Sequence, residues 1–145
     1  MVEQTPRRIL PVVIGLALTG LLLALLAYAA HRRNQQQSAV PALAIVAPLP
    51  ESAVDSPLVV TFTSTRALEL SAAGWGYHGL HLHMSLNDVS LMPAAADITP
   101  TAARTYQWLI PVVRRGSVTV SLGWADAAHR PLVAGMSEVV TMVVR

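Results

Sequence analysis

Two histidines separated by one residue are the side chains of this sequence best suited to chemistry. His81 and His83 lie in an alternating run, and residues two apart on a β-strand point to one face, about 7 Å apart. They can share a transition-metal ion, with His129, His78 or a methionine as third ligand. They can equally occupy the polar face of a half-exposed strand and bond to neighbouring side chains. Because the spacing fixes no third ligand, we expect this second arrangement and predict no metal site.

No catalytic motif accompanies these histidines. Asp126 and His129 fall in a segment typical of a loop between strands, in which Asp126 caps the turn and Pro131 stiffens it. An acid–histidine pair also needs a nucleophile or a substrate pocket, and the sequence has no G-x-S-x-G, H-E-x-x-H or Gly-rich phosphate loop. The chain contains no cysteine, which excludes disulfides and thiolate chemistry. We therefore expect no enzyme, no cofactor and no small-molecule substrate.

Short apolar or alternating runs between turn residues predict an all-β domain over residues 41–145. In the histidine run, Leu82 and Met84 alternate with polar residues, and Val118 to Trp124 repeats the pattern. Asn87-Asp88 tolerates positive φ and predicts a two-residue hairpin turn. Roughly seven or eight strands in about 105 residues indicate an immunoglobulin-like (Ig-like) Greek-key sandwich. We expect prolines only between the strands, which are predicted at Ala42–Ala47, Leu58–Thr63, Leu68–Leu70, Leu80–Leu86, Val89–Met92, Tyr106–Ile110, Ser117–Trp124 and Glu138–Val144.

Three segments of this domain carry a resemblance to known proteins. They are Ser56–Phe62, the histidine-containing Leu80–His83, and Trp124–Leu132 before the last strand. Together they resemble small bacterial periplasmic sandwich domains of uncharacterised function and, more distantly, the copper-resistance CopC-type domains. The resemblance covers about residues 41–145 and implies an Ig-like sandwich. In CopC-type proteins a histidine at the processed amino terminus is expected to bind the metal, whereas this chain has an apolar segment there.

The segment Gly74–Gly79 sets two large aromatic side chains among glycines. Trp75 and Tyr77 on a mobile loop would suit contact with a protein partner or with lipid headgroups. Alternatively, Trp75 folds back and closes one end of the sandwich. Both arrangements remain open at this point, so Trp75 and Tyr77 are candidate contact residues.

An uncharged stretch of 22 residues precedes the domain. As a helix it would be roughly 33 Å long, which predicts a transmembrane helix over residues 9–30, after a tail at 1–8 and before a linker at 31–40. Within it, Gly20 and Ala24 form a small-residue stripe that would let another helix approach closely. Ala27-Tyr28-Ala29 also fits a signal-peptide cleavage site. Signal-peptide cores are shorter, about 7–15 residues, so we expect a retained anchor.

Charge indicates the setting of the chain rather than its chemistry. The first 33 residues carry +3 and the remainder −1, so the folded domain lacks the basic face that a nucleic-acid partner requires. Two arginines flank the apolar stretch on each side, so the positive-inside rule gives a tie. A short tail before the helix and a long domain after it favour a cytoplasmic N-terminus and a periplasmic domain. The chain contains arginine but no lysine, which we interpret as the codon bias of a GC-rich bacterium.

Taken together, these features predict a non-catalytic, single-span accessory subunit of a larger complex in the bacterial inner membrane. Its partners would be the lipid bilayer and other integral membrane subunits, and its sandwich would be a contact or bracing module. Respiratory and photosynthetic assemblies contain such subunits and are named here only as an analogy. The alternative is a membrane-tethered periplasmic copper-binding protein that uses His81 and His83. An envelope chaperone or assembly factor is not distinguished from the first possibility.

Overall fold

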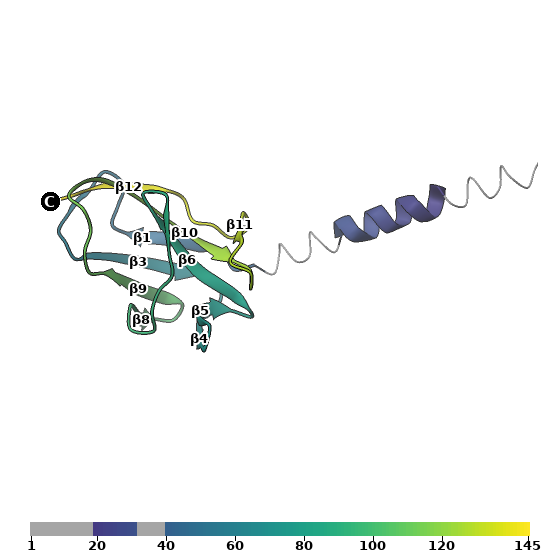
Figure 1. Cartoon of the computed structure of the whole chain (residues 1–145), viewed down its shortest axis with the longest axis horizontal. Helices are drawn as coiled ribbons and strands as arrows, with labels where there is room; N and C mark the ends of the chain where they lie inside the picture. The colour runs from purple at the N-terminus through teal and green to yellow at the C-terminus, as the bar shows by residue number, and fades with distance from the viewer. Residues whose placement is uncertain (1–18, 32–39) are drawn as a thin grey trace, which may run out of the picture. The chain divides into compact units, whose positions relative to one another are not determined.

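A computed structural model describes residues 19–31 and 40–145, which fall in two separate compact units (Figure 1). Residues 19–31 form an α-helix whose leucines are 56–61% exposed. No helix within these described ranges combines the length and apolar character needed to cross a bilayer. The predicted tail, residues 9–18 of the predicted span and most of the predicted linker lie outside the described residues. Gly20 and Ala24 are exposed on the described helix, and the helix-packing stripe stays a prediction.

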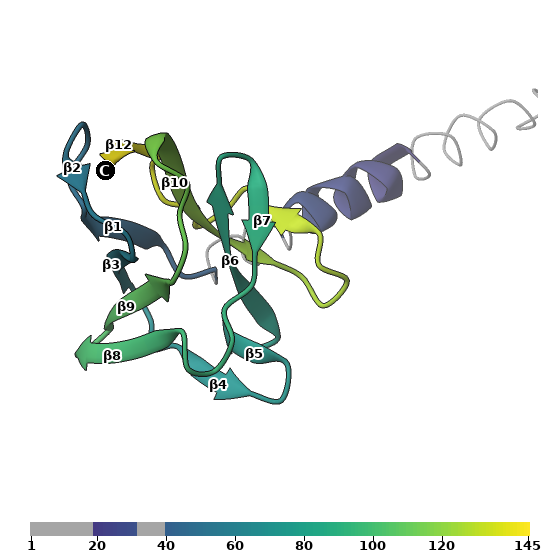
Figure 2. The same ribbon diagram turned by 60° about the vertical axis from the view of Figure 1, so that its left-hand side comes forward.

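Residues 40–145 form a sandwich of two β-sheets (Figure 2). The first sheet has the order β1-β3-β9-β8, with β1 at Leu43–Ala47, β3 at Leu58–Ser64, β8 at Ile98–Ala102 and β9 at Thr105–Ile110. The second has the order β2-β12-β10-β6-β5-β4, with β7 paired to β6 and β11 to β10. Its strands are β2 (Ala53–Val54), β4 (Glu69–Ser71), β5 (Gly74–Tyr77), β6 (Leu80–Leu86), β7 (Val89–Leu91), β10 (Gly116–Ala125), β11 (Pro131–Leu132) and β12 (Val140–Val144).

The order of the principal strands identifies the fold. Counted along the chain, β1, β3, β6, β8, β9, β10 and β12 occupy the places of the seven strands of an immunoglobulin constant-type domain, whose two sheets are ABED and GFC. The neighbouring strands β3 and β9 of the first sheet, and β12, β10 and β6 of the second, pair antiparallel. The predicted Ig-like sandwich is therefore confirmed for the domain.

Alternation of side chains explains why these runs form strands. Along β6, Leu82 and Met84 are fully buried between the sheets, while the intervening histidines are only partly buried. Along β10, Val118 to Trp124 repeats this pattern with its even-numbered residues in the core. Asn87 and Asp88 adopt φ of 48° and 65° in the tight turn between β6 and β7, as the hairpin prediction requires.

The prediction that prolines fall only between strands is wrong at two positions. Pro100 lies inside β8 and Pro131 begins β11. Strand β8 is an edge strand that pairs only with β9, and the two-residue β11 pairs only with β10, so the missing N–H groups interrupt no central ladder. Because β8 buries only Ile98 and β11 is so short, neither has an alternation long enough to recognise from the sequence.

The glycine-rich segment forms strand β5 instead of the expected mobile loop. A Cβ atom at Gly76 would collide with the Leu80 carbonyl, so glycine is what lets β5 lie close to β6 here. Trp75 is 9% exposed, and its indole N–H donates to the Ala95 carbonyl at 3.1 Å. Its burial corresponds to the predicted alternative in which Trp75 closes the sandwich. Tyr77 is half-buried, and a partner contact there stays a prediction.

Candidate functional site

Antiparallel pairing of β6 with β10 brings the predicted histidines to one place. His81 pairs with Ala125 and His83 with Gly123, so the start of β6 lies beside the end of β10. The chain then turns through residues 126–130 and returns as β11, where Leu132 pairs with Trp124. Figure 1 shows β6 and β10 side by side across the domain, with the short β11 at one end of it. This turn carries His129 back over the two histidines of β6.

Three imidazoles meet above this part of the sheet, and we call them the histidine cluster: His81, His83 and His129. The Nδ1 atom of His129 lies 3.4 Å from the Nε2 atom of His83. The rings of His81 and His129 are stacked, with centroids 4.8 Å apart and an interplanar angle of 28°. The His83 and His129 rings are 5.6 Å apart and tilted by 53°. Only His83 and His129 therefore direct ring nitrogens at each other.

Hydrogen bonds at Nδ1 orient the rings of the two β6 histidines, His81 and His83. His81 Nδ1 lies 3.2 Å from the Ala73 carbonyl, which can only accept, so this nitrogen carries the proton and donates. His83 Nδ1 lies 2.9 Å from the Ser90 hydroxyl. In the tautomer with its proton on Nδ1, His83 donates to the Ser90 hydroxyl, and its Nε2 accepts from the Nδ1–H of His129. Metal-binding histidines are commonly held in this way by a partner on the second nitrogen.

The proton affinity of His83 is reduced. Burial, followed by the positive charge that His129 and His81 carry when protonated, holds the pKa of His83 below its usual value of 6.5. His83 therefore stays neutral to lower pH than an ordinary histidine. A neutral imidazole is the form that binds metal ions.

A turn closed by hydrogen bonds to Asp126 presents His129. The Asp126 carboxylate accepts hydrogen bonds from the backbone N–H groups of Ala128 at 2.9 Å and Arg130 at 3.0 Å. It also receives the Arg130 guanidinium at 2.8 and 2.7 Å, and these bonds from Arg130 are the main reason why the pKa of Asp126 is lowered. His129 has φ of 57°, a left-handed conformation that costs energy for residues other than glycine. The Asp126 contacts hold the turn in this shape.

A cavity of about 300 Å³ opens beside the cluster. His83 and His129 line it, together with Met136 and the hydroxyl groups of three serines. The whole lining contains no carboxylate and consists of His83, Ser85, Ser90, Ser121, Gly123, Trp124, Ala125, His129, Pro131, Leu132 and Met136. The site is thus concave and neutral, with imidazole, hydroxyl and thioether groups as its polar or polarisable atoms.

The structure does not bring all of the candidate residues together as their spacing in the sequence suggests. Over residues 19–31 and 40–145, no three His, Cys, Asp or Glu side chains are arranged so that they could hold one metal ion. His81 stacks on His129 instead of sharing a centre with His83. His78 is exposed and packs against the Tyr77 ring at 4.3 Å. Asp126 bonds Arg130 and the turn backbone, so no hydrogen bond joins its carboxylate to an imidazole.

Met136 and Ser90 are site residues that sequence reasoning missed. Ser90 follows the predicted hairpin turn and pairs with Ser85 of β6. Its place opposite β6 could therefore have been predicted from the hairpin. Met136 lies in the connection between β11 and β12, where no periodic pattern indicates which side chain faces the sheet. A methionine was expected only as a generic third ligand.

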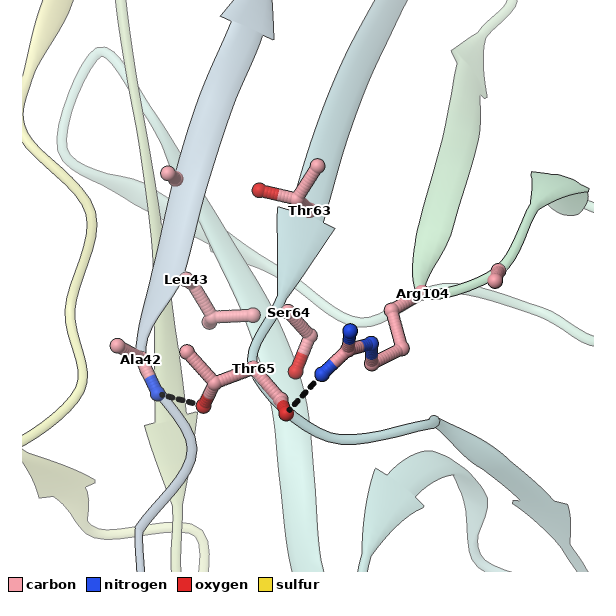
Figure 3. Close-up of a pocket in the computed structure, with 8 residues that line it drawn as sticks. Ala42, Leu43, Thr63, Ser64, Thr65 and Arg104 are labelled. Atoms are coloured by element: carbon pink, nitrogen blue, oxygen red, sulfur yellow. Dashed lines mark hydrogen bonds between the residues drawn. The ribbon is translucent and has the colours of Figure 1, made fainter.

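A second cavity, of about 340 Å³, lies where β1 and β3 approach Arg104 (Figure 3). Arg104 is the one charged residue of its lining, and the guanidinium donates to the Thr65 carbonyl at 3.2 Å. The Thr65 hydroxyl in turn accepts from the Ala42 N–H at 3.0 Å. Figure 3 shows Arg104 turned toward the Thr65 carbonyl. These contacts join two segments of the first sheet and bring no acid–base pair together.

Comparison with known proteins bears on the fold. No protein-family model and no curated protein sequence matches the chain. Among solved structures, 72% of the chain is similar to 20% of the endo-β-1,4-mannanase from Thermotoga petrophila, with 9% identity and a TM-score of 0.47. The chain thus spans about a fifth of that enzyme.

Two further structures are similar over most of their own length. Fibronectin(III)-like modules of Clostridium thermocellum CbhA align with 70% of this chain and 93% of theirs, at 13% identity and a TM-score of 0.40. CopC from Methylosinus trichosporium OB3b aligns over 70% and 92%, at 14% identity and a TM-score of 0.40. At such values the likeness concerns shape alone, and the Ig-like assignment rests on the strand order of the two sheets.

Proposed function

We propose that the Ig-like domain binds a transition-metal ion through His83 and His129, in a bacterial envelope protein tethered to the membrane by its amino-terminal helix. The observation that carries the proposal is the approach of His129 Nδ1 to His83 Nε2 at 3.4 Å. Two nitrogens bound to one ion at about 2.0–2.1 Å in tetrahedral geometry lie roughly 3.3–3.4 Å apart. The separation therefore already suits a shared ion.

Three properties of the site support this proposal. The Ser90 hydroxyl bonds His83 Nδ1 at 2.9 Å and so orients the ring with Nε2 toward His129. The lowered pKa of His83 favours the neutral ligand form. His129 is exposed, so an ion has access to the pair from solvent. To bind an ion, His129 must carry its proton on Nε2 instead of on the Nδ1 that bonds His83, so that both nitrogens present lone pairs. The two rings already lie at a suitable separation, which lowers the ordering cost of binding.

Calorimetric titration of the full chain in detergent micelles tests the proposal. We expect saturable binding of one Zn(II) or Cu(II) ion per chain, and loss of that binding in the double variant His83→Ala with His129→Ala. The variant His78→Ala is the matched control, because it removes an imidazole that lies outside the cluster. Circular dichroism checks that all variants keep the β-fold. If the wild type binds none of Zn(II), Cu(II) and Cu(I), or the double variant binds as the wild type does, the proposal is wrong.

A second candidate function rests on the helix at residues 19–31. Its leucine side chains are 56–61% exposed, and Tyr28 is 58% exposed. Apolar surface of this extent is unfavourable in water, so lipid or protein is expected to cover it. We propose on this ground that the chain is also a non-catalytic, single-span accessory subunit of a larger inner-membrane complex, with the domain in the periplasm. Gly20 and Ala24 would face a neighbouring helix.

Native separation of mild-detergent extracts, followed by mass spectrometry, tests the subunit proposal. We expect the wild-type chain to comigrate with larger integral membrane subunits. The double variant Gly20→Leu with Ala24→Leu should be released, because the added side chains prevent close helix approach. Leu22→Val serves as control for a change elsewhere on the same helix. Migration of the wild type as a lone chain, or unchanged association of the double variant, would argue against the helix contact.

A further inference from the structure

We propose that the thioether of Met136 is the third ligand of this site and that the site therefore selects Cu(I) over Zn(II). This inference rests on the proposed metal binding by His83 and His129 and specifies its ion. It depends on where the β11–β12 connection places Met136, and on the neutral chemistry of the cavity that the three side chains share.

Met136 lies over the strand position that pairs with His83. Gly123 is that position on β10, and a Cβ atom built on it would lie 3.4 Å from the Met136 side-chain Cγ atom. The Met136 side chain thus lies within contact distance of the Gly123 position on the outer face of the sheet. Met136, His83 and His129 all line the same cavity.

The backbone on both sides of Met136 is anchored to strands. The Gly135 carbonyl accepts from the Leu43 N–H at 3.0 Å. The Ser137 N–H donates to the Leu122 carbonyl at 2.9 Å, and the Ser137 hydroxyl accepts from the Leu122 N–H at 2.8 Å. Met136 is nevertheless 48% exposed, so it is not simply part of the core. The fold therefore fixes the backbone on both sides of Met136, and its solvent-accessible side chain lines the same cavity as the two imidazoles.

The donor set indicates which ion it would bind. Thioether and imidazole are neutral donors, and soft sulfur ligands favour Cu(I). Zn(II) is bound chiefly by thiolate, imidazole and carboxylate, and the cavity lining supplies only the imidazoles. A monovalent ion also loses less by the lack of an anionic ligand than a divalent one does. Two histidines and one methionine thus fit Cu(I) best.

Competition for Cu(I) supplied as its bicinchoninate complex, under anaerobic conditions with the full chain in detergent, tests the inference. We expect the wild type to withdraw Cu(I) from the bicinchoninate complex. Met136→Leu should lower the Cu(I) affinity by at least about tenfold, because losing even a residue that only supports a metal ligand typically costs about 10–100-fold. The Zn(II) affinity should not change. Met92→Leu is the control, because Met92 is 44% exposed and does not line the cavity. X-ray absorption at the copper edge should show a sulfur neighbour in the wild type that Met136→Leu lacks.

Each outcome decides between the two proposals. Unchanged Cu(I) affinity in Met136→Leu, with binding still dependent on His83 and His129, would refute the role of Met136 and leave the histidine site intact. An equal loss of Zn(II) and Cu(I) affinity in Met136→Leu would refute Met136 as the source of selectivity, and a wild type that binds Zn(II) as tightly as Cu(I) would refute the selectivity itself. Failure of the wild type to bind any of the ions would refute both proposals.

Discussion

Replacing Trp124 with alanine is expected to lower the free energy of unfolding by about 3–5 kcal/mol. Trp124 is the largest of the fully buried side chains, at 1% exposure, and its loss would leave a cavity between the sheets. Its indole N–H also donates to the Pro41 carbonyl at 2.7 Å, a bond that ties the start of the domain to β10. Urea unfolding of the full chain in detergent, followed by circular dichroism, measures the effect.

A surface variant sets the scale for this measurement. Val133→Ala truncates a side chain that is 90% exposed, and changes at such positions usually stay within about 0.5 kcal/mol. Trp124→Phe keeps much of the ring volume but loses the bond to Pro41, so its effect should fall between the two alanine variants. If Trp124→Ala unfolds at the same urea concentration as Val133→Ala, the indole does not stabilise the core as the structure indicates.

The core at Trp124 and the metal site are parts of one strand. Because side chains alternate along β10, burying Trp124 turns its neighbour Gly123 to the outer face, opposite His83. Trp124 also borders the cavity, and the backbone of Gly135 passes so close to Pro41 and the indole that any side chain at Gly135 would collide with them. Packing between the sheets therefore determines where the connection carrying Met136 crosses the sheet.

Long alternating runs explain how much of the fold could be predicted. The bounds of β6 agree with the prediction, because seven residues with a two-residue period distinguish an inner from an outer face. Strand β8 was missed because it buries only Ile98 and contains Pro100. Strand β5 was mistaken for a loop because its glycines indicate flexibility, whereas Gly76 in fact permits close contact with β6. Whether such a segment forms a strand or a loop depends on contacts with neighbouring strands, which a local sequence pattern does not reveal.

The site was predictable only in part, for a similar reason. The shared face of His81 and His83 follows from strand geometry, and the sequence predicts it. The approach of His129 depends on the pairing of β6 with β10 and on a turn closed by five residues. His81 stacks on His129 and directs its Nδ1 at the Ala73 carbonyl instead of at the other two histidines. These are long-range contacts, and spacing in the sequence does not specify them.

Asp126→Ala is expected to weaken metal binding by about 10–100-fold, which is the range typical for removing a group that orients a metal ligand. The fold should stay intact. Without the carboxylate, the N–H groups of Ala128 and Arg130 lose their acceptor. The turn then keeps only its main-chain bonds, from the Asp126 N–H to the Arg130 carbonyl at 3.0 Å and from the His129 N–H to the Asp126 carbonyl at 2.8 Å. We expect these two bonds to hold the left-handed conformation of His129 less firmly, so that its ring moves away from His83. Asp126 is a positioning residue, so Asp126→Asn, which keeps an oxygen acceptor but not the charge, should retain part of the affinity.

Calorimetric titration with Zn(II), together with urea unfolding of the same samples, separates positioning from general stability. Asp97→Ala is the matched control, because the Asp97 carboxylate likewise accepts a backbone N–H, that of Ala94 at 2.7 Å, in a turn that does not border the cavity. We expect Asp97→Ala to bind as the wild type does and the affinities to fall in the order wild type, Asp126→Asn, Asp126→Ala. Equal affinity in Asp126→Ala and the wild type would show that the turn holds His129 without its carboxylate. A matching loss in Asp97→Ala would show that the effect is one of overall stability, because only the turn at Asp126 carries a ligand.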